Sequence, residues 1–151
     1  MNIVYVSFNS INEPLVQSQV LSYLRGLTIF GHKFYLPTFE PEEVSPERAQ
    51  KINSLLKEHA IKWGHVGYPS SRSPLKFREA LKNAESRIGK LLTSQNIDLI
   101  HARSFLPAIA ARWVSRKHKV PFLLDACGFW AAEKAYKGRL PVRSIGCEYY
   151  T

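Results

Sequence analysis

The chain has 151 residues, of which 45% are hydrophobic, and this is enough to bury one domain core of ordinary size. Its 21 lysines and arginines outnumber its 12 aspartates and glutamates, and the net charge of +9 favours anionic partners such as nucleotides, phospholipid headgroups or nucleic acid. Among the acids only Asp98 and Asp125 are aspartates, which argues against the acidic magnesium cluster of receiver domains and aspartate-based phosphatases.

The two cysteines, Cys127 and Cys147, form no Cys-x-x-Cys pair, so no metal site is expected and a reducing compartment fits best. The chain opens with Met-Asn-Ile-Val-Tyr-Val, which enters a strand without the basic and apolar regions of a signal peptide. No apolar run approaches the roughly 20 residues that a membrane span requires. We therefore expect a cytoplasmic protein that is at most peripherally bound at the inner membrane face.

Strands and helices alternate from the start of the chain. Residues 3–8 are almost continuously apolar, which is typical of a strand buried on both faces of a parallel sheet. Apolar residues then recur at helical spacing, and Gly31 is expected to cap the helix. The residues of this apolar face are Val16, Val20, Tyr23, Leu24, Leu27 and Phe30.

A short second strand is expected at residues 34–36, ended by Pro37. Ser45-Pro46 is a helix N-cap followed by proline at the first helical position. The apolar face of that helix would be Ala49, Ile52, Leu55 and Leu56. Residues 61–66 indicate a third, peripheral strand.

Ser73-Pro74 repeats the N-cap and proline signal after a loop at residues 67–74. The next helix has an apolar face and several basic residues elsewhere, most of which we interpret as a solvated surface. The apolar residues are Phe77, Leu81, Ala84, Ile88 and Leu91, and the basic ones are Lys76, Arg78, Lys82, Arg87 and Lys90.

Residues 96–133 predict a β-α-β unit with polar residues at both strand ends. Leu99 and Ile100 lead to His101 and Arg103, and a helix opening at residues 104–107 runs to about residue 117. A second strand at residues 121–124 ends on polar residues and glycine. The chain thus predicts an α/β, Rossmann-like three-layer sandwich with a parallel sheet and right-handed crossovers, as one domain spanning residues 1–151.

The ends of these strands are where a parallel α/β fold binds its ligands, because loops diverge there and helix N-termini point their N–H groups outward. The first of these loops has neither the Gly-x-Gly-x-x-Gly motif of dinucleotide-binding folds nor a Walker pattern. Its uncharged donors and acceptors suit a hydroxyl-rich ligand, although an ordinary capped polar loop would look the same. They are Asn9, Ser10, Asn12, Gln17, Ser18 and Gln19.

Three further residues at strand ends are candidates for chemistry. His101 could donate to or accept from a ligand near neutral pH, or serve as a satisfied structural histidine. Arg103 could bind a phosphate with two N–H groups, or form a salt bridge to Asp125 or Glu133. Asp125 could orient a sugar hydroxyl or a nearby histidine, or cap the turn that follows it.

The residues after Asp125 carry weaker signals. Cys127 could line the site or act as a small buried hydrophobe. Gly128 would permit a positive φ or the close approach of a ligand. Phe129 and Trp130 could cover the edge of the cleft or belong to the core.

Taken together, these segments resemble the N-terminal domain of the retaining GT-B glycosyltransferases. The resemblance covers nearly the whole chain and lies in four stretches. They are the opening Asn-Ile-Val-Tyr-Val-Ser-Phe, the helix Gln-Ser-Gln-Val-Leu-Ser-Tyr-Leu-Arg-Gly-Leu with its Phe-Gly-His end, Asp-Leu-Ile-His-Ala-Arg-Ser, and Pro-Phe-Leu-Leu-Asp-Ala-Cys-Gly-Phe-Trp-Ala-Ala-Glu.

The resemblance implies one half of a GT-B fold that binds the sugar or glycolipid acceptor, with no cofactor. The nucleotide-sugar donor would be held by a C-terminal domain that we expect to be absent, together with the family's glutamate pair. Family members often have histidine or arginine where this chain has Cys127, and many have a Gly-Gly turn that it lacks. His101 and Asp125 are therefore the expected catalytic residues. Asn9, Ser10, Asn12, Gln17, Arg103, Cys127 and Gly128 are the expected substrate-binding residues.

The leading hypothesis is thus the acceptor-binding half of a retaining glycosyltransferase of polysaccharide biosynthesis, which is expected to be inactive alone. The alternative is a stand-alone nucleotide- or anion-binding module without catalysis. Nucleic acid is an unlikely partner because the basic residues are spread over several helices and are not interleaved with aromatic residues on one face. The helix with Lys76, Lys82 and Lys90 is a candidate for contact with anionic lipid.

Overall fold

The structure of the protein is a computed structural model that describes residues 1–67 and 73–128. Within these residues one parallel five-stranded sheet has the strand order β3-β2-β1-β4-β5, which confirms the predicted α/β class. The strands are β1 (Asn2–Val6), β2 (Lys33–Glu40), β3 (Ile61–Gly67), β4 (Leu99–Arg103) and β5 (Phe122–Asp125). The predictions for Phe129, Trp130, Glu133 and Cys147 lie outside the described residues.

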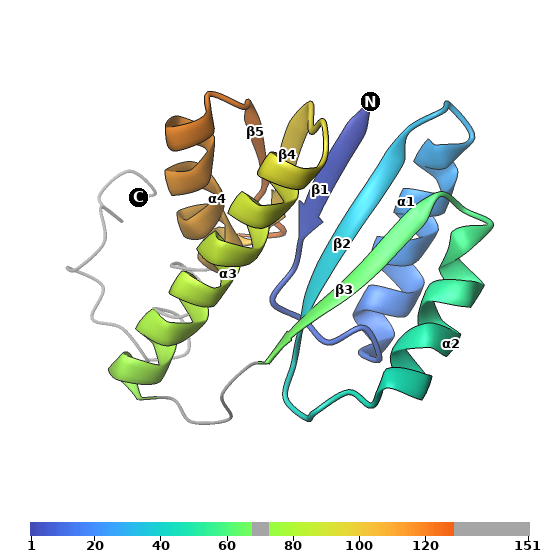
Figure 1. The fold of residues 1–151 in the computed structure, drawn as a ribbon, viewed down its shortest axis with the longest axis horizontal. Coiled ribbons are helices and arrows are strands. Elements are labelled where there is room, and N and C mark those ends of the chain that lie inside the picture. The colour runs from blue at the N-terminus through green and yellow to red at the C-terminus, as the bar shows by residue number, and fades with distance from the viewer. Residues whose placement is uncertain (68–72, 129–151) are drawn as a thin grey trace, which may run out of the picture.

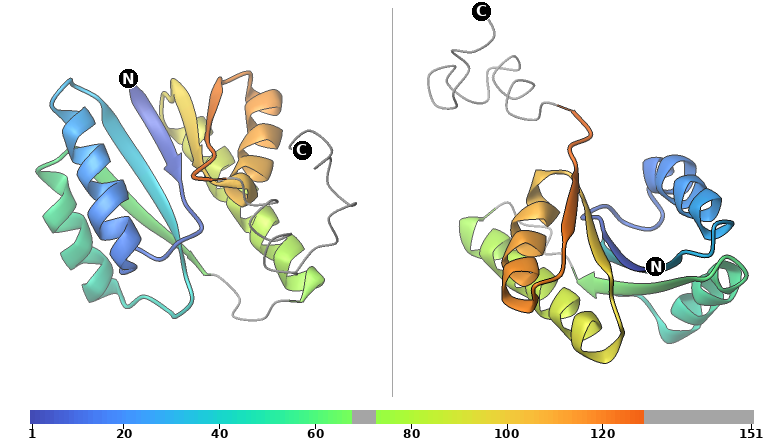
Figure 2. Two further views of the ribbon diagram at one scale, coloured as in Figure 1. Left: turned by 180° about the vertical axis from the view of Figure 1, so that it is seen from behind. Right: turned by 90° about the horizontal axis from the view of Figure 1, so that it is seen from above.

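Helices cover both faces of the sheet (Figures 1 and 2). A π-helical turn, η1 (Val16–Val20), continues into α1 (Leu21–Thr28), and these pack on one face together with α2 (Pro46–Lys57). The helices α3 (Pro74–Ser94) and α4 (Phe105–His118) cover the other face. The three predicted layers, helix on sheet on helix, are therefore present.

The central strand β1 explains why the chain opens with a continuous apolar run. Ile3 and Tyr5 enter the core beneath η1, α1 and α2, whereas Val4 and Val6 enter the core beneath α3 and α4. Since successive side chains of a strand point to opposite faces, a strand buried on both faces cannot alternate with polar residues.

The second strand is longer than predicted, because it continues through Pro37 to Glu40. The Phe34 amide donates to Ala60 of the β3 side, so alternation along the strand turns the Pro37 nitrogen toward β1. The pairing of β1 with β2 ends at Val4 and Tyr35, so the two strands are no longer paired at Pro37. The missing N–H group of Pro37 therefore removes no hydrogen bond from the ladder. Proline is tolerated where no ladder hydrogen bond is lost.

The apolar faces predicted for the first two helices include residues that are exposed in the structure. The first helix ends at Thr28, and Phe30 lies in the following turn with 77% of its surface exposed. In α2 only Leu56 is fully buried and Leu55 is 64% exposed, because this helix covers the border of the sheet. Gly31, expected as the helix cap, has φ +80° in the turn just beyond the helix end. The apolar face predicted for α3 is confirmed by its buried residues Leu81, Ala84 and Ile88.

The third strand lies at the edge of the sheet, which confirms the predicted peripheral position. Its outward Trp63 amide donates to Asn53 Oδ1 of α2 at 3.0 Å, and the Trp63 indole donates to Thr38 Oγ1 at 2.7 Å. A helix side chain that occupies an edge amide reduces the tendency of that edge to pair with another chain.

None of the helices in residues 1–67 and 73–128 has the length and apolar content needed to cross a bilayer.

We expect Ser45→Ala to lower the free energy of unfolding by about 1 kcal/mol, because Ser45 Oγ accepts the Arg48 amide at the start of α2. Urea denaturation measures the change. As a control, Ser22→Ala removes an exposed hydroxyl from the interior of α1 and should stay within about 0.5 kcal/mol of the original protein. Equal effects of the two substitutions would contradict the capping role.

Candidate functional site

The strand order reverses between β1 and β4, and such a switch point opens a crevice at the carboxyl ends of the strands. In register, Tyr5 of β1 lies opposite His101 of β4, and Arg103 of β4 lies opposite Asp125 of β5. These pairs lie on the sheet face that carries η1 and α1, since the side chains of His101 and Arg103 meet residues of those helices.

His101 is buried, with 6% of its surface exposed. Its ring lies 4.6 Å from the Tyr5 ring and 6.1 Å from the Tyr23 ring, the latter in an edge-to-face arrangement. Its Nε2 atom is buried and has no hydrogen-bond partner among the residues that the structure describes. Burial lowers the pKa of His101, and the Arg103 charge lowers it further against the opposing effect of Asp125. The imidazole is therefore neutral at physiological pH.

Arg103 connects three elements at the carboxyl edge. Its Nη1 lies 3.5 Å from Asp125 Oδ2, and its Nη2 donates to Gln19 Oε1 of η1 at 2.7 Å. Burial disfavours the guanidinium charge, but Tyr5, Cys127 and Asp125 outweigh it and raise the pKa of Arg103. The side chain thus stays charged and is held by partners on both flanking elements.

Asp125 caps the turn that follows β5. Its Oδ1 accepts the Cys127 amide at 3.3 Å and lies 3.2 Å from Cys127 Sγ. Burial and the bond to Asp125 raise the pKa of the Cys127 thiol. A protonated thiol is a poor nucleophile, so Cys127 contributes shape and a weak donor to this edge. Gly128 has φ +146°, as its predicted conformational role requires.

The turns beside the Arg103–Asp125 pair are strained. Ser104 has φ +76° and ψ +167°, a region that residues with a Cβ rarely adopt, and Cys127 has φ +54°. The Ser104 amide donates to the Asp125 carbonyl at 2.7 Å, which holds the β4 and β5 ends together. Strain of this kind costs on the order of 1–3 kcal/mol and is concentrated at functional sites in proteins.

The polar residues of the first loop mostly bind within their own segment. Asn9 Nδ2 donates to Glu13 Oε2 at 2.7 Å, and Gln17 Nε2 donates to the Ile11 carbonyl. Ser10 Oγ donates to Glu40, whereas Asn12 is exposed. These contacts match the alternative of an ordinary capped loop.

The buried Glu40 carboxylate at the end of β2 anchors this loop. Besides Ser10, it accepts the Ile11 amide at 2.8 Å and the Thr38 hydroxyl at 2.6 Å. The second strand was expected to end at Pro37, which would leave Glu40 outside the sheet; because β2 runs past Pro37, Glu40 is buried.

The structure thus brings His101, Arg103, Asp125 and Cys127 to one edge, together with Gln19 from the predicted polar segment, and adds Tyr5 and Tyr23. Tyr5 and Tyr23 were expected only as core and helix-face residues. Their contact with His101 depends on the pairing of β1 with β4 and the packing of α1 on the sheet, and neither can be read from the local sequence.

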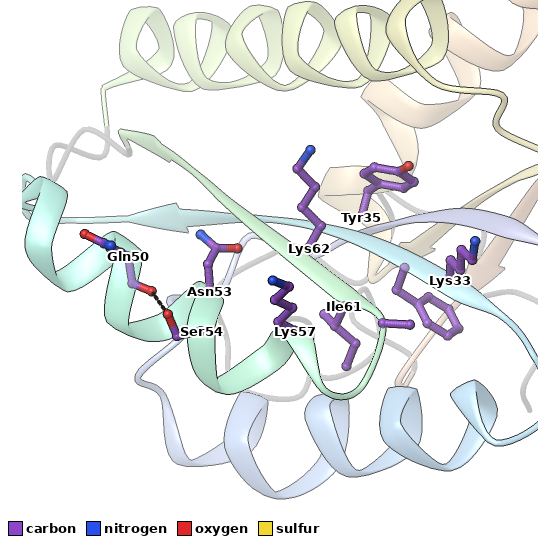
Figure 3. Close-up of a pocket in the computed structure, with 10 residues that line it drawn as sticks. Lys33, Tyr35, Gln50, Asn53, Ser54, Lys57, Ile61 and Lys62 are labelled. Carbon is purple, nitrogen blue, oxygen red and sulfur yellow. Dashed lines mark hydrogen bonds between the residues drawn. The ribbon is translucent and has the colours of Figure 1, made fainter.

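A hollow of about 490 Å³ lies elsewhere, at the amino ends of β2 and β3 (Figure 3). Its floor includes the buried Phe34 and Ile61, and Lys33, Lys57 and Lys62 border it. Parallel sheets bind ligands at the opposite, carboxyl edge, so we assign the functional site to the polar cluster there.

No group of three or more histidine, cysteine, aspartate or glutamate residues in the described part of the chain could hold a metal ion.

We predict that the His101 imidazole titrates below its ordinary value of 6.5, as proton-detected NMR would show. Because the unfolded chain then binds the proton more tightly, the free energy of unfolding should fall as the pH drops below 6.5 toward the folded-state pKa. The variant His101→Phe should lose this part of the pH dependence. Identical slopes for the two proteins, or a midpoint above 6.5, would contradict the buried neutral imidazole.

We predict that Glu40→Ala lowers the free energy of unfolding by roughly 3 kcal/mol, because three donors lose their buried acceptor. The Ile11 amide should also exchange with solvent faster. Glu42→Ala, at an exposed neighbouring position, is the matched control and should change stability by less than about 0.5 kcal/mol. Unchanged Ile11 exchange in Glu40→Ala would show that the carboxylate does not anchor the loop.

Comparison with known proteins supports the fold. No protein-family model matches the sequence, and no curated protein resembles it. A glycosyltransferase of kitacinnamycin superposes with a TM-score of 0.59 at 12% identity, covering 96% of this chain and 36% of that one. A glycosyltransferase from Rickettsia africae gives 0.54 at 18% identity, covering 82% and 28%. The C-terminal domain of a hydrogenase from Pyrococcus furiosus gives 0.55 at 16% identity, covering 82% and 88%.

At these identities the similarity concerns the fold, which is that of a Rossmann-like domain and of GT-B halves. The chain spans about a third or less of the two glycosyltransferases, whereas it spans most of the hydrogenase domain. The chain therefore has a glycosyltransferase-like fold that is also found in another class of protein.

Proposed function

We propose that the chain is the acceptor-binding half of a retaining glycosyltransferase, which transfers a sugar from a nucleotide-sugar donor to a glycan or lipid-linked acceptor. The observation that carries this proposal is the buried His101 with an unpartnered Nε2 beside the Arg103–Asp125 pair, at the strand edge where this fold binds ligands.

A sugar acceptor suits the chemistry of this edge. Hydroxyl groups both donate and accept, so a neutral imidazole can bind one without a charge having to be buried. Asp125 could accept from a second hydroxyl, while Arg103 keeps that carboxylate in place. Tyr5 and Tyr23 contact the imidazole ring, and these contacts together with its burial limit its rotation before a ligand arrives.

In this proposal His101 and Asp125 act on the acceptor hydroxyl, by hydrogen bonding and by orienting it. The donor diphosphate needs preorganised positive groups and helix dipoles. The first loop here has no glycine turn, and its polar groups are bound to one another. The donor would therefore be held mainly by a second domain.

A lipid-linked acceptor would also bring the protein to a membrane, with α3 as the proposed contact. Lys82 and Lys90 are exposed on this helix, while Lys76 forms an ion pair with Glu79 at 3.3 Å. Each exposed lysine near an anionic leaflet would contribute about 1 kcal/mol.

The fold also occurs in the hydrogenase domain, so the alternative of a nucleotide- or anion-binding module without catalysis is tested in the same experiment. We expect the chain to bind a member of a panel of glycans and lipid-linked saccharides. The affinity for that saccharide should be about tenfold lower in the variants His101→Phe and Asp125→Asn. Exposed Glu58→Gln is the control and should bind as the original chain does.

In the same calorimetric titrations, uridine, guanosine and adenosine diphosphate sugars should bind only weakly, and the chain alone should transfer no sugar. Tight donor binding, or turnover lost in His101→Phe or Asp125→Asn, would show instead that the chain is a complete enzyme. Nucleotide binding unaffected by either variant, without sugar binding, would favour the non-catalytic module.

A further inference from the structure

Arg87 occupies an unusual position on the other face of the sheet. It extends from α3 onto β3, where the residue beneath its guanidinium is Gly64. Its Nε is buried and has no hydrogen-bond partner within residues 1–67 and 73–128. A buried donor without a partner costs on the order of 1–3 kcal/mol, so this arginine is under-satisfied as the structure stands.

Arg87 borders a hollow whose charged lining residues, among those described, are basic. This hollow has a volume of about 230 Å³, and none of the described residues around it is acidic. They are His65, Val66, Asn83, Ser86, Arg87 and Lys90. On its other side Arg87 borders a second, smaller hollow that includes Lys62. Among the described residues, no carboxylate forms an ion pair with Arg87, Lys90 or Lys62.

We propose that this hollow between α3 and β3 is a binding site for a phosphate group, free or carried by a small molecule. The Arg87 guanidinium would donate to the phosphate oxygens with two N–H groups, and Lys90, one turn along the same helix face, would supply the second positive charge. Ser86 and Asn83 would complete the donor set from the same helix. A bound dianion offsets the repulsion between the two cations.

Gly64 makes this arrangement possible. A Cβ at this position would collide with Arg87 Nη2 and would lie 3.2 Å from Arg87 Cζ. The absence of a side chain in β3 therefore lets the guanidinium lie directly on the strand, at the border of the hollow. Because the clash involves the end of a flexible side chain, Gly64→Ala should displace Arg87 and leave the fold intact.

An adjoining hollow limits where the anion can bind. It is lined by Glu42, Glu43 and Glu79 and shares His65 and Asn83 with the site. Repulsion from these carboxylates confines a phosphate group to the side of Arg87 and Lys90.

The site is separate from the proposed acceptor site. Gly64 and Arg87 lie on the α3 side of the sheet, whereas His101, Arg103 and Asp125 lie on the α1 side. Failure of either proposal thus leaves the other unaffected.

The test is a titration of the full chain with inorganic phosphate, followed through the backbone amide NMR signals of residues 83–90 and by calorimetry. A parallel titration with glycerol 1-phosphate distinguishes a free phosphate from a phosphate monoester. We expect saturable shifts that include Arg87 and Ser86, and a loss of about tenfold or more in affinity for Arg87→Met and for Gly64→Ala.

The two variants separate position from charge, since Gly64→Ala keeps every positive charge of the molecule. Two controls should bind phosphate as the original chain does. Gly26→Ala adds a methyl group where no atom lies within 4 Å, and Lys119→Met removes an exposed charge elsewhere.

Several results would overturn the proposal. They are shifts that do not saturate, shifts in Lys119→Met that are reduced as much as in Arg87→Met, or unchanged binding in a Gly64→Ala protein whose spectrum shows a native fold. Tighter binding of glycerol 1-phosphate than of inorganic phosphate would support the site and identify its ligand as a monoester.

Discussion

The parallel pairing of β1 with β4 is the constraint on which the remaining structure depends. It brings segments almost 100 residues apart into register, with Tyr5 opposite His101. It also reverses the strand order, so that η1, α1 and α2 lie on one face, α3 and α4 lie on the other, and the loops after β1 and β4 diverge. The pairing is stabilised by burial on both faces, since Val4, Tyr5 and Ile100 are all almost completely shielded from water.

At the carboxyl edge of the sheet, Arg103 and Asp125 both carry charge and hold the ends of β4 and β5 in place. Arg103 remains charged because Asp125, Cys127 and Tyr5 outweigh its partial burial, and Asp125 in turn orders the turn after β5. The strained Ser104 links the same two strand ends through its amide. Among the described residues the buried His101 Nε2 has no hydrogen-bond partner, which is why the proposed acceptor contact centres on His101.

The two faces of the sheet distribute their polar groups differently. On the α1 face, polar groups are concentrated beyond the strand ends and are mostly paired, as Glu40 and Arg103 illustrate. On the α3 face, Arg87 lies over the middle of an edge strand and depends on the missing side chain of Gly64. Arg87 and Lys90 thus gather part of the net charge of +9 around one hollow, although most lysines lie on solvated helix surfaces.

The sequence by itself determined the order of strands and helices, both proline-marked helix starts and the expectation that His101, Arg103 and Asp125 follow strands, because these depend on local periodicity and capping. Only the tertiary structure decided that β2 runs through Pro37, that Glu40 is buried, and that Arg87 lies on Gly64. Each of these depends on which neighbour a backbone or side-chain group meets across the sheet, and contacts between residues distant in sequence leave no local pattern.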